Sequence, residues 1–368
     1  MKTFFKNFMT VLLIGIPLIA LIFFYMIQSG FLKPSLQTSK SDNMIEENFT
    51  EIEEPSEIIV TSVTLSFAGD VQFSEDYTKA FDANGISAIA DDTMLSHMQN
   101  ADLFILNNEF SFSLRGEPME EKQYTFRTDP KYVKILQELG TDVVSVANNH
   151  TIDFGQDAFL DTIDTLSNAE IAYVGGGRNL SEALTPATYT INGQSFAIFA
   201  GTRVLPSTDW YAKPDRPGML PTYDPTELNR AISEAEIQYD HIIVFVHWGV
   251  ERVEIPEEYQ RDLAKGYIDA GADLIVGCHP HILQGYEYYK GVPIVYSLGN
   301  YLFGNREDRT VLLNAEFNAD KELSLRLIPC QRVDGVLTEM KDAQNLYRHL
   351  SNLSYGAKIT ENGILKQK

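Results

Sequence analysis

The chain has 368 residues, of which 44% are hydrophobic, so it can bury the core of one large domain or two smaller ones. Its formal net charge of -22 at pH 7 disfavours attraction to phosphate backbones, so we expect no nucleic-acid partner. The two cysteines, Cys278 and Cys330, exclude a disulfide-rich fold, although a single bridge between them remains an alternative.

The N-terminus contains an apolar segment that is long enough to cross a membrane. Residues 8–27 carry no charge, and about 20 apolar residues span a bilayer as a helix. Lys2 and Lys6 precede the segment, as at a cytoplasmic end. A cleaved signal peptide is the alternative, but no small-residue cleavage motif follows directly. We expect a cytoplasmic end over residues 1–7, a single-pass anchor in the cell membrane over residues 8–27, and an extracytoplasmic C-terminal domain.

Residues 28–57 have the composition of a flexible linker. They are rich in Ser, Asn, Glu and Thr, and six glutamates fall between positions 46 and 57. An acidic tether of this kind extends away from an anionic membrane surface.

From residue 58 onward, apolar strand patterns alternate with helical patterns. This alternation predicts an α/β domain over residues 58–305 with largely buried sheets, completed by a hairpin and helix over 306–353 and followed by a weakly patterned tail over 354–368. Pro130 opens one helix and Gly140 ends it, and Asn192-Gly193 predicts a hairpin. The expected strands are 58–68, 102–106, 142–147, 171–174, 187–191, 195–200, 241–246, 273–276, 286–289, 292–297, 310–317 and 322–328, and the expected helices are 88–99, 130–139, 154–167, 225–238 and 257–270.

Side chains that bind metals follow several of the predicted strands. Open α/β sheets place their sites at the carboxyl ends of strands, so these side chains should meet in one polar site. Four of the seven histidines belong to the set. The candidate residues are Asp70, Glu109, Asn149, His150, His247, His279 and His281.

The densest cluster is His279-Pro280-His281. In an extended segment, which Pro280 favours, imidazoles two residues apart point to the same side. Two unrelated loop histidines are the alternative, just as Asp70 or Asn149 could simply cap the next helix. Carboxylate, imidazole and amide oxygen together suit one or two ions of Mn, Fe or Zn. Cys278 is expected to pack inward rather than to bind metal.

Six segments between about residues 62 and 305 match the motifs of one known family in their order. They are Phe67-Ala68-Gly69-Asp70-Val71, Asn107-Asn108-Glu109, the run from Ala147 to Gly155, Val246-His247-Trp248-Gly249, Gly277-Cys278-His279-Pro280-His281 and Tyr296-Ser297-Leu298-Gly299-Asn300. The chain resembles the CapA family of capsule and poly-γ-glutamate synthesis proteins, which is related to the calcineurin-like metallophosphoesterases.

The resemblance implies a four-layer α/β/β/α sandwich with a metal centre, and Glu109 would bridge two ions. It implies that His150 protonates a leaving group and that the metal ligands are Asp70, Glu109, Asn149, His247, His279 and His281. Where the phosphoesterases carry Asp-x-His, this chain reads Asp70-Val71-Gln72. One imidazole is therefore missing, which favours a single ion or a weakly held second one.

Several arginines could meet an anionic ligand, since the guanidinium group binds carboxylate or phosphate through two donors. We expect Arg127, Arg203 and Arg252 to bind substrate, and Arg115 and Arg216 are further candidates. Arg127 ends Tyr124-Thr125-Phe126-Arg127, which also resembles the family pattern. A solvated surface charge is the alternative for each.

Two functions follow from this pattern. The first is a membrane-anchored, extracytoplasmic protein of capsule or poly-γ-glutamate biosynthesis or export, which handles the anionic polymer beside a membrane-bound synthase. The second is a metal-dependent hydrolase of a phosphoester or an amide, with His150 as general acid. A purely structural protein of the cell envelope is the third alternative. The expected meeting of four histidines in one site argues against it.

Overall fold

The computed structural model describes residues 61–304 and 309–368. The predicted membrane anchor at residues 8–27 and the acidic tether at residues 28–57 lie outside the described residues. Within the described ranges, no helix is both long enough and apolar enough to cross a membrane.

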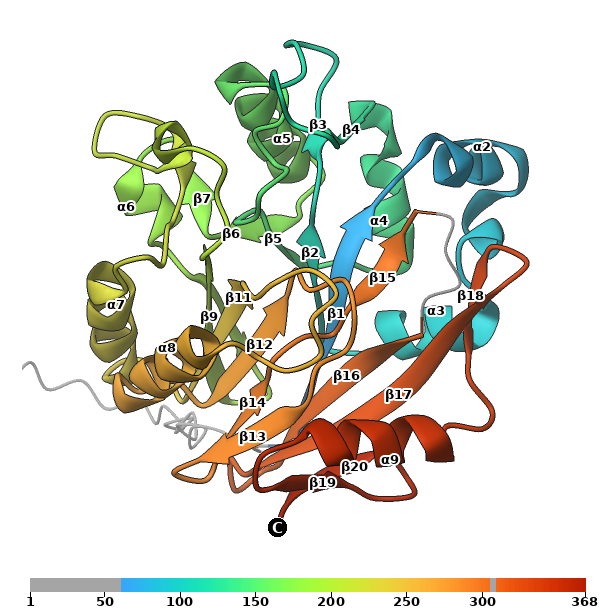
Figure 1. Ribbon diagram of the computed structural model, residues 1–368, viewed down its shortest axis with the longest axis vertical. Helices are drawn as coiled ribbons and strands as arrows, with labels where there is room; N and C mark the ends of the chain where they lie inside the picture. Colours follow the sequence, from blue (N-terminus) through green and yellow to red (C-terminus); the bar gives the residue numbers. More distant parts are fainter. Residues whose placement is uncertain (1–60, 305–308) are drawn as a thin grey trace, which may run out of the picture. The chain divides into compact units, whose positions relative to one another are not determined.

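Two mixed β-sheets form the framework of the domain (Figure 1). The larger sheet has ten strands in the order β19-β20-β17-β16-β1-β2-β5-β6, with β15 beside β1 and β18 beside β17. Its strands are β1 (Val63–Gln72), β2 (Leu103–Asn108), β5 (Val143–Ser145), β6 (Ala172–Val174), β15 (Asn300–Phe303), β16 (Thr310–Phe317), β17 (Leu323–Val333), β18 (Val336–Glu339), β19 (Ala357–Ile359) and β20 (Ile364–Gln367).

The smaller sheet has six strands in the order β13-β14-β12-β11-β9-β8. They are β8 (Ala187–Ile191), β9 (Gln194–Thr202), β11 (His241–His247), β12 (Leu274–Cys278), β13 (Tyr286–Tyr289) and β14 (Val292–Val295). Two short pairs complete the strands: β3 (Ser111–Phe112) with β4 (Arg127–Thr128), and β7 (Gly176–Gly177) with β10 (Gly218–Met219).

The two sheets face each other across a shared hydrophobic core, and helices cover their outer faces. Neighbouring residues of a strand point to opposite faces, so Ile105 packs between the sheets while Phe104 packs against the helices. The helices over the larger sheet are α2 (Glu75–Asn84), α3 (Asp92–Gln99), α4 (Val133–Leu139) and α5 (Gln156–Asn168). Those over the smaller sheet are α6 (Leu180–Ala183), α7 (Thr226–Glu236) and α8 (Glu258–Asp269), and α9 (Gln344–Leu353) packs at the inter-sheet core.

The predicted α/β organisation is confirmed, and two turn predictions hold in detail. β8 and β9 pair as an antiparallel hairpin with Ile191 opposite Gln194. Asn192 and Gly193 between them have φ of 51° and 75°, as a two-residue turn with both central residues left-handed requires. Gly140 ends α4 with φ of 80°.

Three sequence expectations are corrected by the structure. Helix α2 was not predicted, because its polar sequence has only a weak apolar stripe. Residues 354–368 are not a tail: β20 pairs with β17, and Ala357 and Leu365 enter the inter-sheet core. Such short strands carry too few apolar residues to show a period. Cys278 and Cys330 are free and lie in different cores, so the Cys278–Cys330 alternative is wrong.

Candidate metal centre

The carboxyl ends of five strands, β1, β2, β5, β11 and β12, bring the predicted ligands to one place. Asp70 lies where β1 shifts register against both of its parallel neighbours, opposite Asn107 and Asn300. The preceding Gly69 permits a close approach of backbones, since a Cβ atom there would lie 1.9 Å from the Gly299 carbonyl oxygen. A side chain at position 69 would therefore push β1 away from the segment that ends at Asn300.

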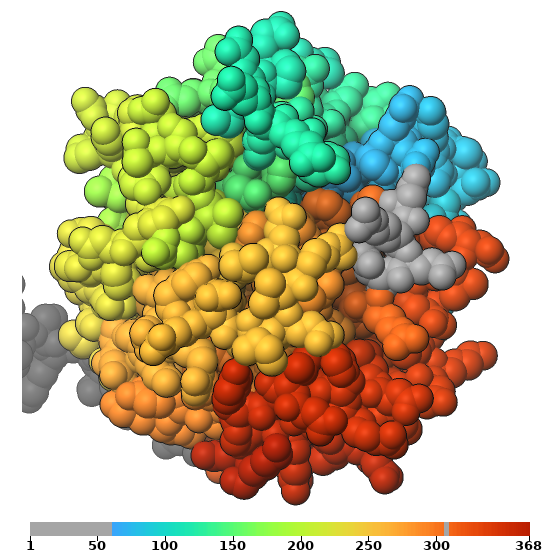
Figure 2. All heavy atoms as spheres, in the orientation of Figure 1, coloured from blue at the N-terminus to red at the C-terminus, as the bar shows by residue number. Residues whose placement is uncertain are grey.

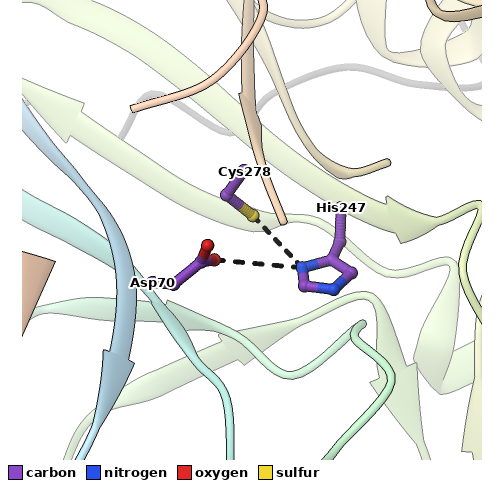
Figure 3. A group of neighbouring side chains, drawn as sticks. All are labelled: Asp70, His247 and Cys278. Atoms are coloured by element: carbon purple, nitrogen blue, oxygen red, sulfur yellow. Dashed lines mark hydrogen bonds and ion pairs between the residues drawn. The ribbon is translucent and has the colours of Figure 1, made fainter. Parts of the chain in front are cut away.

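Asp70, His247 and Cys278 form one group of neighbouring ligand atoms (Figure 3). Nδ1 of His247 lies 4.0 Å from Oδ1 of Asp70 and 3.4 Å from Sγ of Cys278. All three side chains are buried. Burial, followed by the charges of Asp70 and Glu109, raises the pKa of the Cys278 thiol well above its usual range. Cys278 packs inward as expected, because its side chain is buried in the core between the sheets.

The opposite edge of the His247 ring faces a second set of ligand atoms. Nε2 of His247 lies 2.9 Å from Oδ1 of Asn149 and 3.6 Å from Oε1 of Glu109. Glu109, His247 and His279 form one group that could hold a cation, and Asp70, Glu109 and His281 form another. The six predicted metal ligands are therefore brought together, although their role as ligands stays a prediction.

The two histidines of the His279-Pro280-His281 segment meet by a different route from the one predicted. The segment is not extended: His279 and His281 have φ of 95° and 58°, in the left-handed region. Such conformations cost roughly 1–3 kcal/mol each for residues other than glycine and persist where surrounding contacts impose them. The rings still lie near each other, with centroids 5.7 Å apart, and Nδ1 of His281 lies 3.4 Å from Oδ2 of Asp70.

Two buried polar atoms in this cluster lack hydrogen-bond partners within the described part of the chain. They are Oε1 of Glu109 and Nδ1 of His279. Buried polar atoms are nearly always hydrogen-bonded, and a carboxylate oxygen and an imidazole nitrogen without partners are atoms that a bound cation would satisfy. With the carboxylates, imidazoles and amide oxygen around them, the residues present fit a divalent metal ion.

Burial and neighbouring charges shift the pKa values of the cluster in both directions. Burial, together with the charge of Asp70, raises the pKa of Glu109 well above its usual range. Burial and the neighbouring His281 lower the pKa of His279 to about 3, which leaves the neutral imidazole that metals bind. For Asp70, burial acts to raise the pKa, but the hydrogen bond and charge of His281 outweigh it and lower the pKa.

His150 lies beside this cluster in a network that includes a buried lysine. Nδ1 of His150 lies 2.7 Å from Oδ2 of Asp153, which also accepts a hydrogen bond of 2.8 Å from the Phe126 backbone N–H. The Lys122 ammonium donates to Oδ1 of Asp153 and to the Asn149 carbonyl oxygen. Nδ1 of His150 also lies 3.1 Å from the Lys122 ammonium, so Asp153 and Lys122 together orient this edge of the ring.

Sequence reasoning missed Lys122. A single lysine between Glu121 and Gln123 carries no motif of its own. Lys122 lies in the connection between β3 and β4, and this connection folds back toward the centre. The Met119 N–H of the same connection donates a hydrogen bond of 2.7 Å to the Asp153 carbonyl oxygen. That contact links residues 34 positions apart, and no local pattern encodes it.

The five arginines that are candidates for binding an anionic ligand fall into two groups. Arg115 and Arg216 form ion pairs with Asp161 and Asp209. Arg127, Arg203 and Arg252 have no carboxylate partner among the described residues. The Arg127 guanidinium donates twice to backbone carbonyl oxygens and stacks on Phe154, and that of Arg203 stacks on tyrosines. For Arg252, the backbone N–H donates to the Pro280 carbonyl oxygen.

The fold and the cluster define an α/β protein with a buried polar centre that fits a divalent metal ion. A family model extends this assignment: the chain belongs to the bacterial capsule synthesis protein family PGA_cap, whose model matches residues 64–305. This match confirms the resemblance to the CapA family.

Similar proteins include the PGA biosynthesis protein CapA of Bacillus subtilis (strain 168), which is 33% identical over 258 residues, 67% of this chain and 65% of that protein. The capsule biosynthesis protein CapA of Bacillus anthracis is 29% identical over 319 residues, 83% of this chain and 75% of that protein. A probable polyglutamine synthesis accessory protein of Mycobacterium tuberculosis (strain ATCC 25618 / H37Rv) is 31% identical over 209 residues, 54% of this chain and 55% of that protein. The match to the Bacillus subtilis protein thus spans slightly less than two thirds of its length.

Proposed function

We propose that this protein serves the biosynthesis or export of capsule or poly-γ-glutamate through a divalent-metal centre that contacts the anionic polymer. The names of the two Bacillus relatives, a PGA biosynthesis protein and a capsule biosynthesis protein, support the biosynthetic role. The observation that carries the metal proposal is the pair of orphaned buried atoms, Oε1 of Glu109 and Nδ1 of His279, within a cluster of ligand-type side chains.

In this proposal the ion is Mn, Fe or Zn, held by Asp70, Glu109, Asn149, His247, His279 and His281. The bound ion supplies a positive charge that attracts carboxylate groups. The chain contributes the arrangement: Asn107 donates 2.8 Å to Asp70, and Asn300 lies 2.7 Å from Nδ1 of His281, so both ligands are fixed in orientation. Gln72 replaces the histidine of the phosphoesterase pattern, which favours one tightly held ion. We also propose that the domain is a four-layer sandwich of the metallophosphoesterase type, as the family resemblance implies.

Metal analysis of the full-length protein after gentle purification tests the centre. We expect close to one ion per chain, and markedly less in His279→Ala. The control is His349→Ala, which removes an exposed histidine paired with Glu254. Complementation of a strain that lacks the gene tests the biological role: His279→Ala should reduce surface polymer, and His349→Ala should not. Wild-type protein without metal would contradict the centre, and unchanged polymer in the gene's absence would contradict the role.

We further propose that residues 8–27 anchor the protein in the cell membrane, that residues 28–57 form the tether, and that the domain lies outside the cytoplasm beside a membrane-bound polymer synthase. The uncharged apolar run with preceding lysines supports the anchor. Protease treatment of intact spheroplasts should digest the domain while a cytoplasmic marker survives. Protection of the domain until the membrane is lysed would contradict this topology.

Hydrolysis is the second candidate function, and the His150–Asp153 hydrogen bond favours it. Asp153 orients the ring so that Nε2 of His150 is available to hold or move a proton at a substrate atom. Assays with a phosphodiester, a phosphomonoester and a γ-linked glutamyl peptide, each with Mn(II), compare wild type with His150→Ala. We expect a loss of about 100-fold in the variant for the true substrate. Equal rates, or no turnover of any substrate, would remove the catalytic role of His150.

A further inference from the structure

The loop that follows β9 begins directly beside the metal centre. The backbone N–H of Arg203 donates 2.8 Å to the carbonyl oxygen of His247, and the hydroxyl of Thr202 lies 3.3 Å from the same oxygen. Because His247 is a proposed metal ligand, these contacts hold the backbone of Arg203 directly against a residue of the centre. Figure 2 shows the segment of residues 203–223 adjoining the segment of residues 249–259 on the face that it draws.

Two aromatic rings hold the Arg203 guanidinium. Its central carbon lies 3.8 Å from the centroid of the Tyr223 ring and 5.1 Å from that of Tyr259. The Tyr259 hydroxyl accepts a hydrogen bond of 2.7 Å from the Gly249 N–H, and the Tyr211 ring stacks on Tyr223. Contacts on the face of a planar guanidinium leave the N–H donors along its edge available to another group.

No carboxylate, hydroxyl or carbonyl group in the described residues takes up those donors. Arg203 shares the lack of a carboxylate partner within the described chain with Arg127 and Arg252, in a sequence of 51 acidic and 29 basic residues, and differs from them in lying against two tyrosine rings. Arg115, Arg178, Arg230 and Arg261 each form an ion pair within the domain. In so acidic a chain, an arginine oriented by tyrosines but left without an anion is arranged for an anion from outside. The Tyr223 side chain is 45% exposed, so the position is open to solvent.

We propose that Arg203, held by Tyr223 and Tyr259, is a carboxylate-binding subsite beside the metal centre. It would bind a side-chain or terminal carboxylate of a glutamate chain through two parallel N–H···O hydrogen bonds, while a neighbouring part of that chain approaches the metal ligands. This inference rests on the proposed function and deepens it, since it names the residue that selects a carboxylate-bearing polymer. It also explains how a chain of net charge -22 admits a polyanion: the rim of the site presents a fixed positive group.

The test measures binding of a γ-linked glutamate oligomer of defined length to the metal-loaded full-length protein by calorimetry. Three variants are compared with wild type: Arg203→Ala, Arg203→Lys, which keeps the charge but loses the planar fork, and Tyr223→Ala, which removes one ring. The matched control is Arg230→Ala, which removes an arginine paired with Glu227 and Glu234 on α7. Tripolyphosphate serves as a second probe, and metal content is measured for every variant.

We expect Arg203→Ala to weaken binding of the glutamate oligomer at least ten-fold, Arg203→Lys to recover only a small part of that loss, and Tyr223→Ala to weaken binding by a smaller factor. Metal content and binding by Arg230→Ala should match wild type. If wild type binds the oligomer and Arg203→Ala binds it equally well, the subsite is wrong while the proposed function stands. If metal-loaded wild type does not bind the oligomer, the proposed polymer contact fails and the subsite with it. Binding of tripolyphosphate alone, lost in Arg203→Ala, would show that the ligand is phosphate and would overturn the carboxylate assignment.

Discussion

Nε2 of His247 lies 2.9 Å from Oδ1 of Asn149, although 98 positions separate the two residues along the chain. His247 ends β11 of the six-stranded sheet, whereas Asn149 follows β5 of the ten-stranded sheet. This contact joins the carboxyl ends of both sheets, so the centre exists only when the sheets are packed face to face. The stability of the sheet packing and the integrity of the site are therefore linked.

Removal of the His247 imidazole should abolish metal binding. His247 belongs to two of the three ligand groups, with Asp70 and Cys278 in one and with Glu109 and His279 in the other. We expect His247→Ala to retain less than about a tenth of the wild-type metal, because removing an imidazole ligand should weaken metal affinity by at least the roughly 10–100-fold that loss of an outer-shell partner costs. Elemental analysis of the full-length protein measures this.

A chelator provides a second readout for the same variant. Because a ligand that binds only the folded state stabilises it, EDTA should lower the Tm of wild type and leave that of His247→Ala unchanged. His349→Ala, an exposed histidine, should behave as wild type. An equal response of wild type and His247→Ala to EDTA would argue against a metal held by His247.

Replacement of Lys122 by Met should destabilise the fold. Asp153 is fully buried, and the Lys122 ammonium is one of its three partners. Loss of one member of a buried ion pair leaves an uncompensated charge, which costs on the order of 3 kcal/mol of unfolding free energy. Chemical denaturation measures the change.

The double variant Lys122→Met/Asp153→Asn tests whether the pair is the cause. It should be less destabilised than the sum of the two single variants, because each alone leaves its partner unpaired. Lys79→Met removes an exposed lysine paired with Glu75 and should change stability by less than about 0.5 kcal/mol. Strict additivity of the two buried substitutions would refute the coupling.

Two glycine substitutions should change the free energy of unfolding in opposite directions. In Gly69→Ala, the new Cβ would lie 1.9 Å from the Gly299 carbonyl oxygen, so backbone must move and stability should fall by about 3 kcal/mol or more. In Gly266→Ala, within α8, the closest neighbouring atom is 3.8 Å away. There we expect a gain of roughly 0.5–1 kcal/mol from helix propensity. Thermal and chemical unfolding of both variants would check the contrast, and a loss of stability in Gly266→Ala would contradict it.

Mild acid should destabilise the domain through His241, which lies far from the centre at the start of β11. Burial lowers its pKa from 6.5 to about 4, the charge of Asp240 acts to raise it, and that of Lys321 to lower it. Its ring packs against Phe196 and Phe317. Between pH 6.5 and pH 4 the unfolded state therefore binds more protons than the folded state, and stability falls as pH falls through this window.

His241→Asn isolates this contribution, because asparagine does not titrate. The unfolding free energy of wild type and variant should be compared at pH 7.5, 5.5 and 4.5. The wild type should lose more stability than the variant on acidification, even if the variant is less stable at pH 7.5. Parallel curves across this range would show that His241 is not the responsible group.

The parts of the fold predicted well are those that local patterns encode. The Asn192-Gly193 turn and the Gly140 helix end require left-handed backbone, which these residue types adopt readily, so short sequences predicted both. We could predict that Asp70, Glu109 and His247 lie near the carboxyl ends of strands, because each comes after a run of apolar residues. Helix α2 and the strands β19 and β20 were missed because their burial depends on partners far along the chain.

The alternation of strands and helices, the family and the set of ligand-type residues could all be predicted from the sequence, since each depends on residue type and order. Three arrangements become visible only in the folded chain: His279 and His281 meet through left-handed backbone rather than an extended strand, Lys122 supports the Asn149–Asp153 turn, and Arg203 lies between tyrosines without a carboxylate partner among the described residues. The physical reason is the same in each case. These arrangements arise from contacts between segments that packing brings together, and such contacts leave no period or motif in the local sequence.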